Sequence, residues 1–365
     1  KSIDSEGQLI EFGGVTVLIG PNGAGKSNFI SFFRMINEMT ENNLTGYIGG
    51  NGRASSFLYF DPVTTMSLRA EIIFSNEEEN IKNSYRFGLS YEIGNTFGFN
   101  NEEIAYKKDD LPEERTVLQT VGFRESLLNQ YKRAVGRERV IYDLLKNFSV
   151  YQFHNTSGTA GFRRSCNISG ASTLLGDGSN LASILYAMAN NSATSKYYKR
   201  IVSRINAIFP QFDDFVLEPL GKEGVAQFQT ELKWKEKGRG QIFAPYQLSD
   251  GSLRFMALTT LLLQPPHWLP RVIVIDEPEL GLHPTAISDL AGMVKSAGRH
   301  AQVILATQSP RLVDEFEPNQ IVVVEYVDRN KRSEFKKQDK DKLAEWLDRY
   351  TLSDLWDMNI LGGKP

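Results

Sequence analysis

A glycine-rich stretch near the start of the sequence limits strongly which folds this chain can adopt. Residues 20–27 read GPNGAGKS: a glycine, four residues, and then glycine, lysine and serine, which is the spacing of a P-loop. An apolar, β-branched run at 15–19 precedes it, as expected of a buried parallel strand. Apolar residues recur at helical spacing between 29 and 39. This strand–loop–helix order predicts a phosphate-binding loop at the start of an α/β domain.

The loop carries the groups that a nucleoside triphosphate needs. Glycines let backbone amides approach the phosphates closely, and the N-terminus of the following helix adds its dipole. Lys26 would reach the β- and γ-phosphates, and the hydroxyl of Ser27 would hold Mg²⁺. We therefore expect ATP and Mg²⁺ as ligands. The predicted nucleotide-binding residues of the loop are Gly20, Pro21, Asn22, Gly23, Ala24, Gly25, Lys26, Ser27 and Asn28.

A second apolar strand ends in two acids. Residues 272–275 read VIVI and are followed by Asp276 and Glu277, which is the Walker B arrangement. Asp276 would complete the Mg²⁺ shell with Ser27. Glu277 would polarise an attacking water as general base. Together with Lys26, Glu277 is therefore a predicted catalytic residue.

Composition excludes several other classes of protein. The net charge of −3 gives no global basic field for nucleic acid, although a local patch is compatible with it. A single cysteine, Cys166, cannot form a disulfide within the chain, and four scattered histidines argue against a histidine metal site. The longest apolar run, 256–263, is far too short to span a membrane. We expect a cytoplasmic protein with no membrane role.

The patterning predicts a core interrupted by an insertion. Alternating stretches at 68–74, 85–89 and 97–106 predict antiparallel strands, and the pattern turns mostly helical between 112 and 210. We therefore divide the chain into three segments. They are 1–110, the N-terminal part of the core with the P-loop and an antiparallel lobe; 111–212, a mostly helical insertion; and 213–365, the C-terminal part of the core.

Three further motifs carry a family resemblance. Residues 247–254 read QLSDGSLR and open a helix predicted at 255–263, with Ser249 at N-cap spacing. The phrase LSDGS resembles the signature motif of ABC ATPases, which is usually LSGGQ. With ELGLHP at 279–284 and ATQSP at 306–310, the motif order resembles the ABC-type ATPases of the SMC/RecF branch. More narrowly, it is similar to RecF-like predicted AAA-family ATPases and to the ATPase half of OLD-family proteins.

The resemblance implies a fold and a mode of assembly. The fold would be α/β, a P-loop NTPase of ABC type with a parallel-sheet core, an antiparallel β lobe and an inserted, mostly helical subdomain. The chain would form a head-to-tail dimer or a higher oligomer. Ser249, Asp250 and Gly251 would then contact the γ-phosphate that the other subunit binds, although Asp250 stands where the signature usually has glycine.

Besides Asp250, one more position departs from the family pattern, and one expected residue cannot be placed. Gln308 occupies the switch position, usually a histidine, where we expect a catalytic role. Glutamine can hydrogen-bond a phosphate or water but cannot take up a proton, which puts fast hydrolysis in doubt. No pattern in the sequence places the Q-loop glutamine of these ATPases.

The resemblance also suggests what the switch controls. OLD-family proteins carry a Toprim nuclease after the ATPase, whereas only about 40 residues follow the last expected strand here, at 321–327, too few for such a domain. Similar stand-alone ATPases of bacterial anti-phage systems work with a separate effector, often a nuclease, and this is the interpretation we favour.

Two alternatives remain open. A RecF-like DNA repair and recombination ATPase would bind DNA directly, and a slow or non-hydrolysing nucleotide-gated scaffold would follow from Gln308. The basic residues that could contact DNA phosphates are Lys132, Arg133, Arg137, Arg139, Arg163 and Arg164.

Overall fold

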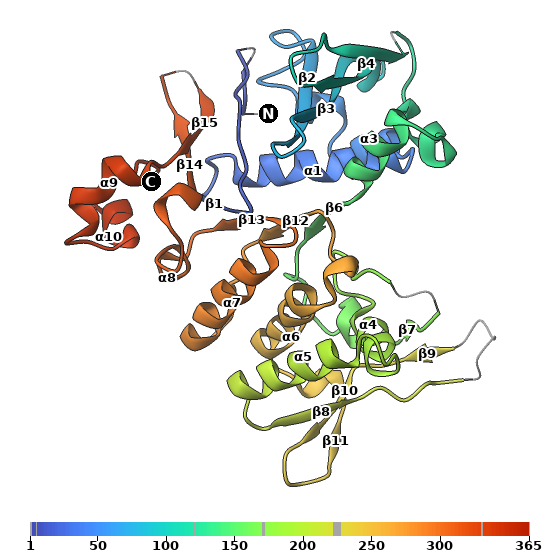
Figure 1. Cartoon of the computed structure of the whole chain (residues 1–365), viewed down its shortest axis with the longest axis vertical. Helices are drawn as coiled ribbons and strands as arrows, with labels where there is room; N and C mark the ends of the chain where they lie inside the picture. Colours follow the sequence, from blue (N-terminus) through green and yellow to red (C-terminus); the bar gives the residue numbers. More distant parts are fainter. Residues whose placement is uncertain are drawn as a thin grey trace. The chain divides into compact units, whose positions relative to one another are not determined.

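The computed structural model describes residues 2–4, 6–119, 121–169, 172–221, 228–329 and 331–364. The chain divides into two compact units (Figure 1). Unit 1 comprises Lys1–Leu9, Asn28–Phe148 and Val327–Glu334. Unit 2 comprises Ile10–Ser27, Ser149–Tyr326 and Phe335–Pro365. All the predicted motifs of the nucleotide site, apart from Asn28, therefore belong to unit 2.

A six-stranded sheet with the order β15-β14-β1-β13-β12-β6 organises unit 2. Its inner strands β14, β1, β13 and β12 are parallel, as expected for strands that contain continuous apolar runs. Each of these strands is buried over most or all of its length, which explains the continuous apolar runs in the sequence. The bounds are β1 Val15–Ile19, β6 Phe148–Tyr151, β12 Val272–Asp276, β13 Gln302–Thr307, β14 Ile321–Val327 and β15 Arg332–Lys337.

Helices α6 (Asp250–Leu263) and α7 (Pro284–Ala297) lie on one side of this sheet (Figure 1). Every residue of α6 from Phe255 to Leu263 is buried, because α4, α5 and α7 pack around it. The helix begins five residues earlier than the predicted start at 255, directly after Ser249. The other helices of unit 2 are α4 Leu181–Ala189, α5 Ser195–Ile208, α8 Pro310–Val313, α9 Lys340–Leu347 and α10 Leu352–Asp357, with 3-10 turns η3 Gly161–Arg163, η4 Pro245–Gln247, η5 Pro266–Trp268 and η6 Pro318–Gln320.

Small antiparallel sheets complete unit 2. Strands β8 (Phe212–Val216), β10 (Lys233–Glu236) and β11 (Ile242–Phe243) form one, and β7 (Cys166–Asn167) pairs with β9 (Gln229–Thr230) in the other. The first sheet is held by aromatic packing, with the ring centroids of Trp234 and Phe243 4.7 Å apart. Phe212, Phe215 and Trp234 of this sheet also belong to the main hydrophobic core of unit 2.

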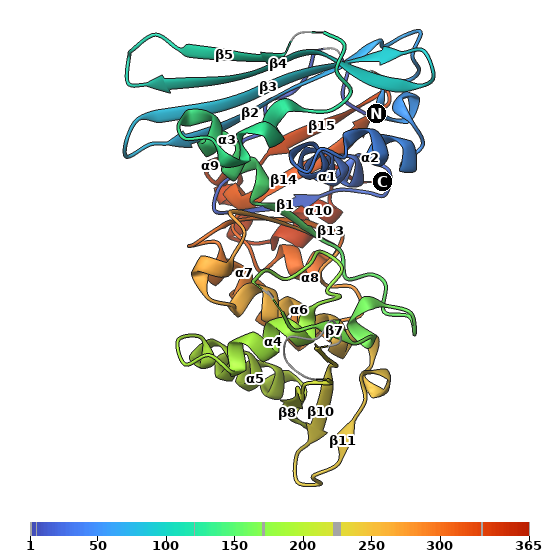
Figure 2. The same cartoon turned by 90° about the vertical axis from the view of Figure 1, so that its right-hand side faces the viewer.

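Unit 1 is an antiparallel sheet covered by helices on one face (Figure 2). Its strands are β2 Ser67–Asn76, β3 Ile81–Glu92, β4 Thr96–Lys108 and β5 Glu114–Gln119; its helices are α1 Lys26–Thr40, α2 Leu44–Gly50 and α3 Arg137–Lys146, with η1 Ala54–Phe57 and η2 Leu127–Arg133. Tyr85, Phe87 and Leu89 alternate along β3 and are buried, as expected for one apolar face. Phe32 of α1 stacks on Phe87 with centroids 6.4 Å apart.

One expectation for this region was wrong. The helical pattern predicted after residue 112 begins later, because residues 114–119 form strand β5, paired with β4. This edge strand is exposed at four consecutive positions, so no apolar alternation marks it in the sequence. Helices α3, α4 and α5 follow it, as predicted. The division into three segments at 110 and 212 stays a prediction.

The expected fold class is confirmed: a parallel-strand core carries separate antiparallel sheets and helices. Within the residues that the structure describes, none of the helices combines the length and the apolar character needed to cross a bilayer.

Candidate nucleotide-binding site

The candidate site lies where neighbouring parallel strands of unit 2 end. Ile19, the last residue of β1, is opposite Thr307 of β13, and Asp276 of β12 is opposite Ala306. The segments that follow these strands therefore emerge side by side. They are the P-loop, the Walker B acid and the switch segment. Loops at the carboxyl ends of parallel strands are the usual place for ligand sites in α/β sheets.

The glycines of the P-loop adopt backbone conformations that other residues rarely reach. Gly20 has φ +147° and Gly25 has φ +119°. A Cβ on Gly20 would lie 2.1 Å from the carbonyl oxygen of Val324, so the loop packs directly on the backbone of β14. Gly23 has φ +81°, with open space around a Cβ. The backbone of Pro21, Asn22 and Ala24 completes the turn before α1.

The ammonium group of Lys26 is held inside this turn. Its Nζ donates to the carbonyl oxygens of Gly20 over 2.5 Å and of Pro21 over 3.0 Å. Burial lowers the pKa of Lys26, whereas the nearby carboxylates of Glu277, Asp276 and Glu279 raise it. The turn thus presents a desolvated cation facing the acids that end the neighbouring strand.

Gln308 joins the three segments through its side chain. Its Nε2 donates to Asn22 Oδ1 over 2.8 Å and to Glu277 Oε1 over 3.1 Å. Glu277 itself has φ +44°, in the left-handed region that is strained for a non-glycine residue, while its backbone N–H donates to the carbonyl of Ala306. Such strain commonly accompanies residues held for function. The residues predicted to be catalytic are therefore brought together.

A further carboxylate, Glu279, supports the switch segment. Its Oε1 accepts from Thr307 Oγ1 over 2.6 Å and from the backbone N–H of Gln308 over 3.3 Å. Burial is the main reason why the pKa of Glu279 is raised above its ordinary value. Its other oxygen, Oε2, is buried and has no hydrogen-bond partner among the described residues. Glu279 thus fixes the backbone that carries Gln308.

Sequence reasoning missed two residues beside Asp276. Gln152 directly follows β6, the neighbour of β12, and its Nε2 donates to Asp276 Oδ2 over 2.6 Å. The ring Nε2 of His154 lies 3.2 Å from the carbonyl oxygen of Asp276. A polar residue immediately after a short strand, at the edge where other strands end in polar residues, is the signal that could have identified Gln152.

The signature segment forms the N-terminus of α6. Ser249 is the N-cap, as predicted, and its Oγ accepts from the backbone N–H of Ser252 over 3.1 Å. Ser249 and Asp250 are exposed. A Cβ on Gly251 would lie 2.2 Å from the carbonyl oxygen of Gly281, so this segment packs directly on the turn after the Walker B strand. Glycine is therefore required at 251.

The residues of the site fit ATP and Mg²⁺. A glycine-specific turn that holds a buried ammonium group suits a polyphosphate, and a hydroxyl at Ser27 with a carboxylate at Asp276 suits Mg²⁺, which binds through few protein oxygens. Asn28 belongs to unit 1, where its Nδ2 donates to Ser2 Oγ over 3.2 Å. Its assignment to the nucleotide site therefore rests on the motif alone.

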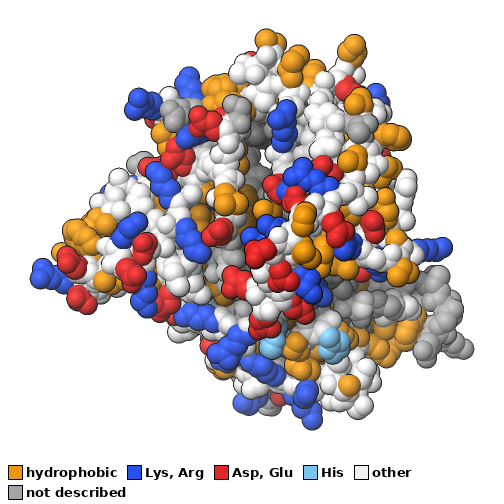
Figure 3. Space-filling model, turned by 45° about the horizontal axis from the view of Figure 1, so that its top comes forward, with side chains coloured by type: hydrophobic (Ala, Val, Ile, Leu, Met, Phe, Trp, Pro, Cys, Tyr) orange, Lys and Arg blue, Asp and Glu red, His pale blue; other side chains and the backbone are white. Residues whose placement is uncertain are grey.

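The basic residues considered for DNA binding are partly engaged with acids. Arg137 pairs with Glu114, and Arg139 with Asp143 over 2.7 Å. Figure 3 shows basic and acidic side chains interspersed over the face that it displays. The ion pairs of Arg137 and Arg139 leave these two guanidinium groups less available to phosphates.

Comparisons with known proteins identify the family and the fold of the chain. The family model described as "AAA domain, putative AbiEii toxin, Type IV TA system" matches residues 15–156 and 181–314. A search of curated proteins gives no match.

Among solved structures, an SMC head bound to the C-winged helix domain of ScpA matches with a TM-score of 0.54 and 15% identity, over 94% of this chain and 96% of that chain. The SMC head domain from Thermotoga maritima matches with a TM-score of 0.41 and 15% identity, over 93% of this chain and 95% of that chain. The first likeness shows the fold of an SMC-head ATPase domain. Since the family model covers more than half of the chain, the chain belongs to this family of AAA domains, and its fold is that of an SMC/RecF-like ABC ATPase.

Proposed function

We propose that this chain binds and hydrolyses ATP with Mg²⁺ and uses the nucleotide to control a head-to-tail dimer. The observation that carries the proposal is the double hydrogen bond of Gln308, which links Asn22 of the P-loop to Glu277 of the Walker B strand. A phosphate bound in the loop would therefore lie beside the candidate base and the switch residue together.

The chain's own residues have distinct tasks in this proposal. Lys26 binds the β- and γ-phosphates, while Ser27 and Asp276 hold Mg²⁺, which supplies neutralisation of phosphate charge when bound. Glu277 accepts a proton from the water whose oxygen attacks the γ-phosphorus. The bond from phosphorus to the β–γ bridging oxygen breaks, and ADP and inorganic phosphate leave. Gln308 orients that water through hydrogen bonds but cannot accept its proton.

A turnover assay tests the enzymatic part. Release of phosphate from ATP should require Mg²⁺ and should be lost in Glu277→Gln, which retains nucleotide binding. Lys26→Ala should lose nucleotide binding altogether. Lys199→Ala is the matched control, because Lys199 is an exposed lysine of α5 in the same unit. Turnover that is equal in wild type and Glu277→Gln would reject Glu277 as the base.

The dimer is proposed because the signature segment is exposed and ordered at the N-terminus of α6. Ser249 and Gly251 would contact the γ-phosphate bound by the second subunit, so ATP would hold the two subunits together and hydrolysis would release them. Helix N-termini with exposed N–H groups favour anions, which supports this assignment. Assembly would then depend on the γ-phosphate, and the protein would act as a switch.

The controlled partner in this proposal is a separate effector, with a nuclease as first candidate, in bacterial anti-phage defence. The support is the resemblance to stand-alone ATPases of anti-phage systems, which work with a separate effector; the description of the family itself names a toxin–antitoxin system. The test is a native pull-down of the tagged protein from its own cells, with mass spectrometry of the bound proteins. A stoichiometric nuclease or toxin-like protein supports the proposal. Recovery of DNA and recombination proteins alone would favour the RecF-like alternative.

A slow or non-hydrolysing scaffold is a second candidate, and the hydrogen bond from Gln308 to Glu277 favours it. The Gln308 amide occupies one oxygen of Glu277 and cannot serve as a proton acceptor in place of a histidine. If this candidate is right, ATP should drive assembly without turnover above the Glu277→Gln background. Clear Glu277-dependent turnover would reject it.

A further inference from the structure

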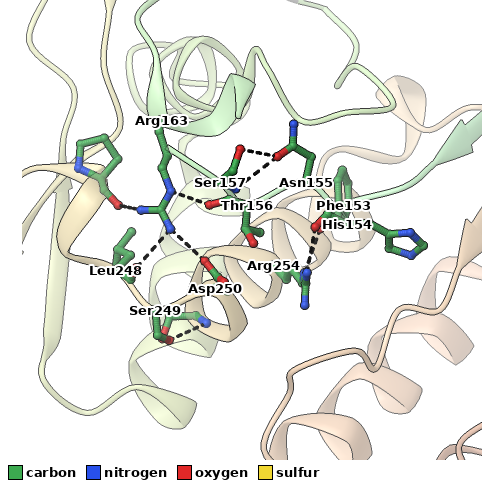
Figure 4. A network of polar contacts seen from close by, with 12 residues as sticks. Phe153, His154, Asn155, Thr156, Ser157, Arg163, Leu248, Ser249, Asp250 and Arg254 are labelled. Carbon is green, nitrogen blue, oxygen red and sulfur yellow. Dashed lines mark hydrogen bonds and ion pairs between the residues drawn. The ribbon is translucent and has the colours of Figure 1, made fainter. Parts of the chain in front are cut away.

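A buried arginine lies beneath the signature segment. Arg163, in the turn η3, is only 6% exposed. Its Nε donates to the carbonyl oxygen of Thr156 over 2.8 Å, and its Nη1 donates to that of Pro245. Its Nη2 donates to the carbonyl of Leu248 over 3.4 Å and to the carboxylate of Asp250 over 3.0 Å (Figure 4). The guanidinium group of Arg163 thus contacts the backbone that precedes Ser249 and also the side chain of Asp250 in the signature segment.

Asp250 is the residue of the signature that most needs such a partner. It stands where the motif usually has glycine, and it brings a carboxylate next to Ser249. In the proposed dimer, this segment meets a triphosphate. Two like charges a few ångströms apart repel each other more strongly near a protein surface than in bulk water, because the effective dielectric constant is lower there. An unpaired carboxylate at this position would therefore oppose assembly.

Because Arg163 is buried, its guanidinium group needs a charged partner. A buried guanidinium is costly unless it is paired and hydrogen-bonded, and Asp250 is the carboxylate that pairs with it. The side chain of Asp250 is 60% exposed, so the pair lies at the border of the core, with the acid facing outward. The buried guanidinium group of Arg163 thus neutralises the charge of Asp250.

The backbone segment that Arg163 contacts also leads to the nucleotide site of the same subunit. Thr156 follows the segment in which Gln152 contacts Asp276. Arg254 of α6 reinforces that segment, because its Nε donates to the carbonyl of Phe153 and its Nη2 to that of His154 (Figure 4). The position of Arg163 is therefore set by the backbone that leaves β6.

We propose that Arg163 is a positioning residue of the signature segment, which neutralises Asp250 and so allows that segment to approach the triphosphate bound by a second copy of the chain. This inference rests on the proposed dimer. It assigns Asp250 to the pair with Arg163 and leaves contact with the γ-phosphate to Ser249 and Gly251. The carboxylate is tolerated only while the guanidinium pairs with it.

The test measures ATP-driven dimerisation in the Glu277→Gln background by light scattering. Arg163→Met should weaken dimerisation at least about tenfold, because a partner charge is left uncompensated. Asp250→Asn alone should change it less than about threefold, since the amide oxygen still accepts from Arg163. The combination of Arg163→Met with Asp250→Asn should recover most of the loss, because the repelling charge is gone.

Controls separate this role from a structural one. Arg164→Met removes the same charge from the neighbouring exposed position and should have no effect. Binding of a fluorescent ATP analogue to the monomer should stay within about threefold in all these variants, because Lys26 and the P-loop are untouched. Raised salt should restore dimerisation of Arg163→Met more than that of its parent, because it screens the repulsion.

Three outcomes would overturn the inference. The first is that Arg163→Met dimerises as well as its Glu277→Gln parent. The second is that the double variant dimerises no more tightly than Arg163→Met alone. The third is that Arg163→Met loses affinity for nucleotide to the same extent as it loses dimerisation. If Arg163→Met does not fold, the same comparison with Arg163→Gln, alone and combined with Asp250→Asn, decides between these outcomes. If the Glu277→Gln parent does not dimerise with ATP, the proposed dimer itself fails and takes the inference with it.

Discussion

The side-chain amide of Gln308 donates a hydrogen bond to the carboxylate of Glu277 over 3.1 Å. The same nitrogen donates to Asn22 over 2.8 Å, so the switch residue spans the P-loop and the Walker B strand. The two ends of this bridge lie far apart in the sequence and meet because β1 and β12 both flank β13. The sheet order therefore assembles the site.

The first prediction concerns this bridge. Gln308→Ala should lower turnover about 100-fold, because a positioned hydrogen-bond donor is lost beside the base. Affinity for nucleotide should change little, since Lys26 and the loop remain. Steady-state phosphate release and a binding titration would measure both. Gln302→Ala, a change of an exposed glutamine at the start of β13, is the control. Unchanged turnover in Gln308→Ala would remove Gln308 from the mechanism.

The second prediction concerns Gln152. Its amide orients the carboxylate of Asp276, so Gln152→Ala should raise the Mg²⁺ concentration needed for half-maximal turnover by about tenfold or more. Binding of nucleotide in the absence of Mg²⁺ should not change. The measurement is turnover against Mg²⁺ concentration, with the exposed Gln211→Ala as control. An unaltered Mg²⁺ dependence would show that this contact does not serve the metal site.

A pair of glycine substitutions tests the packing of the P-loop. In Gly20→Ala, the new Cβ would lie 2.1 Å from the backbone carbonyl of Val324, so the free energy of unfolding should fall by roughly 3 kcal/mol or more. In Gly23→Ala, nothing lies within 4 Å of a Cβ, and only the positive φ costs about 1–2 kcal/mol. Urea unfolding of both variants gives the comparison. Equal losses would mean that contact with Val324 is not what fixes Gly20.

The fourth prediction is a pH dependence from Glu279. Burial raises the pKa of this carboxyl above 4.5, so the folded protein holds its proton more tightly than the unfolded chain does. The resulting stabilisation is fully present below the unfolded pKa and is lost as pH rises through the folded pKa. Glutamine does not titrate, so the Glu279→Gln variant should not lose this stabilisation as the pH rises. Its Tm relative to wild type should therefore increase as the pH rises above the ordinary pKa of a glutamate.

The control for this titration is Glu345→Gln, at an exposed position of α9. Its Tm should follow that of wild type across the same range. Parallel Tm curves for wild type and Glu279→Gln would mean that Glu279 does not titrate differently in the folded state.

The features that sequence predicted well are set by local interactions. The strand at 15–19 is found at these bounds, because a continuous apolar run between turn residues leaves few other structures. Ser249 caps α6 because its hydroxyl reaches an N–H three residues later. The motifs themselves are short and contiguous, so the sequence indicates them directly.

The features that sequence did not reveal depend on residues brought together by the fold. Gln152 reaches Asp276 across 124 positions, and Arg163 reaches Asp250 across 87. In neither pair do the two residues belong to the same helix or strand, so no helical or strand periodicity in the sequence indicates the contact. Strand β5 escaped prediction for another reason: its exposed edge position allows charged and polar residues where a buried strand would show alternation.

The mass of the Glu277→Gln protein in solution, measured by light scattering with and without ATP and Mg²⁺, tests the nucleotide-controlled dimer most directly. ATP should double the mass or raise it to a higher even multiple, and adding Ser249→Arg should prevent the change. A protein that binds ATP but shows no ATP-dependent change in mass would contradict the nucleotide-controlled dimer.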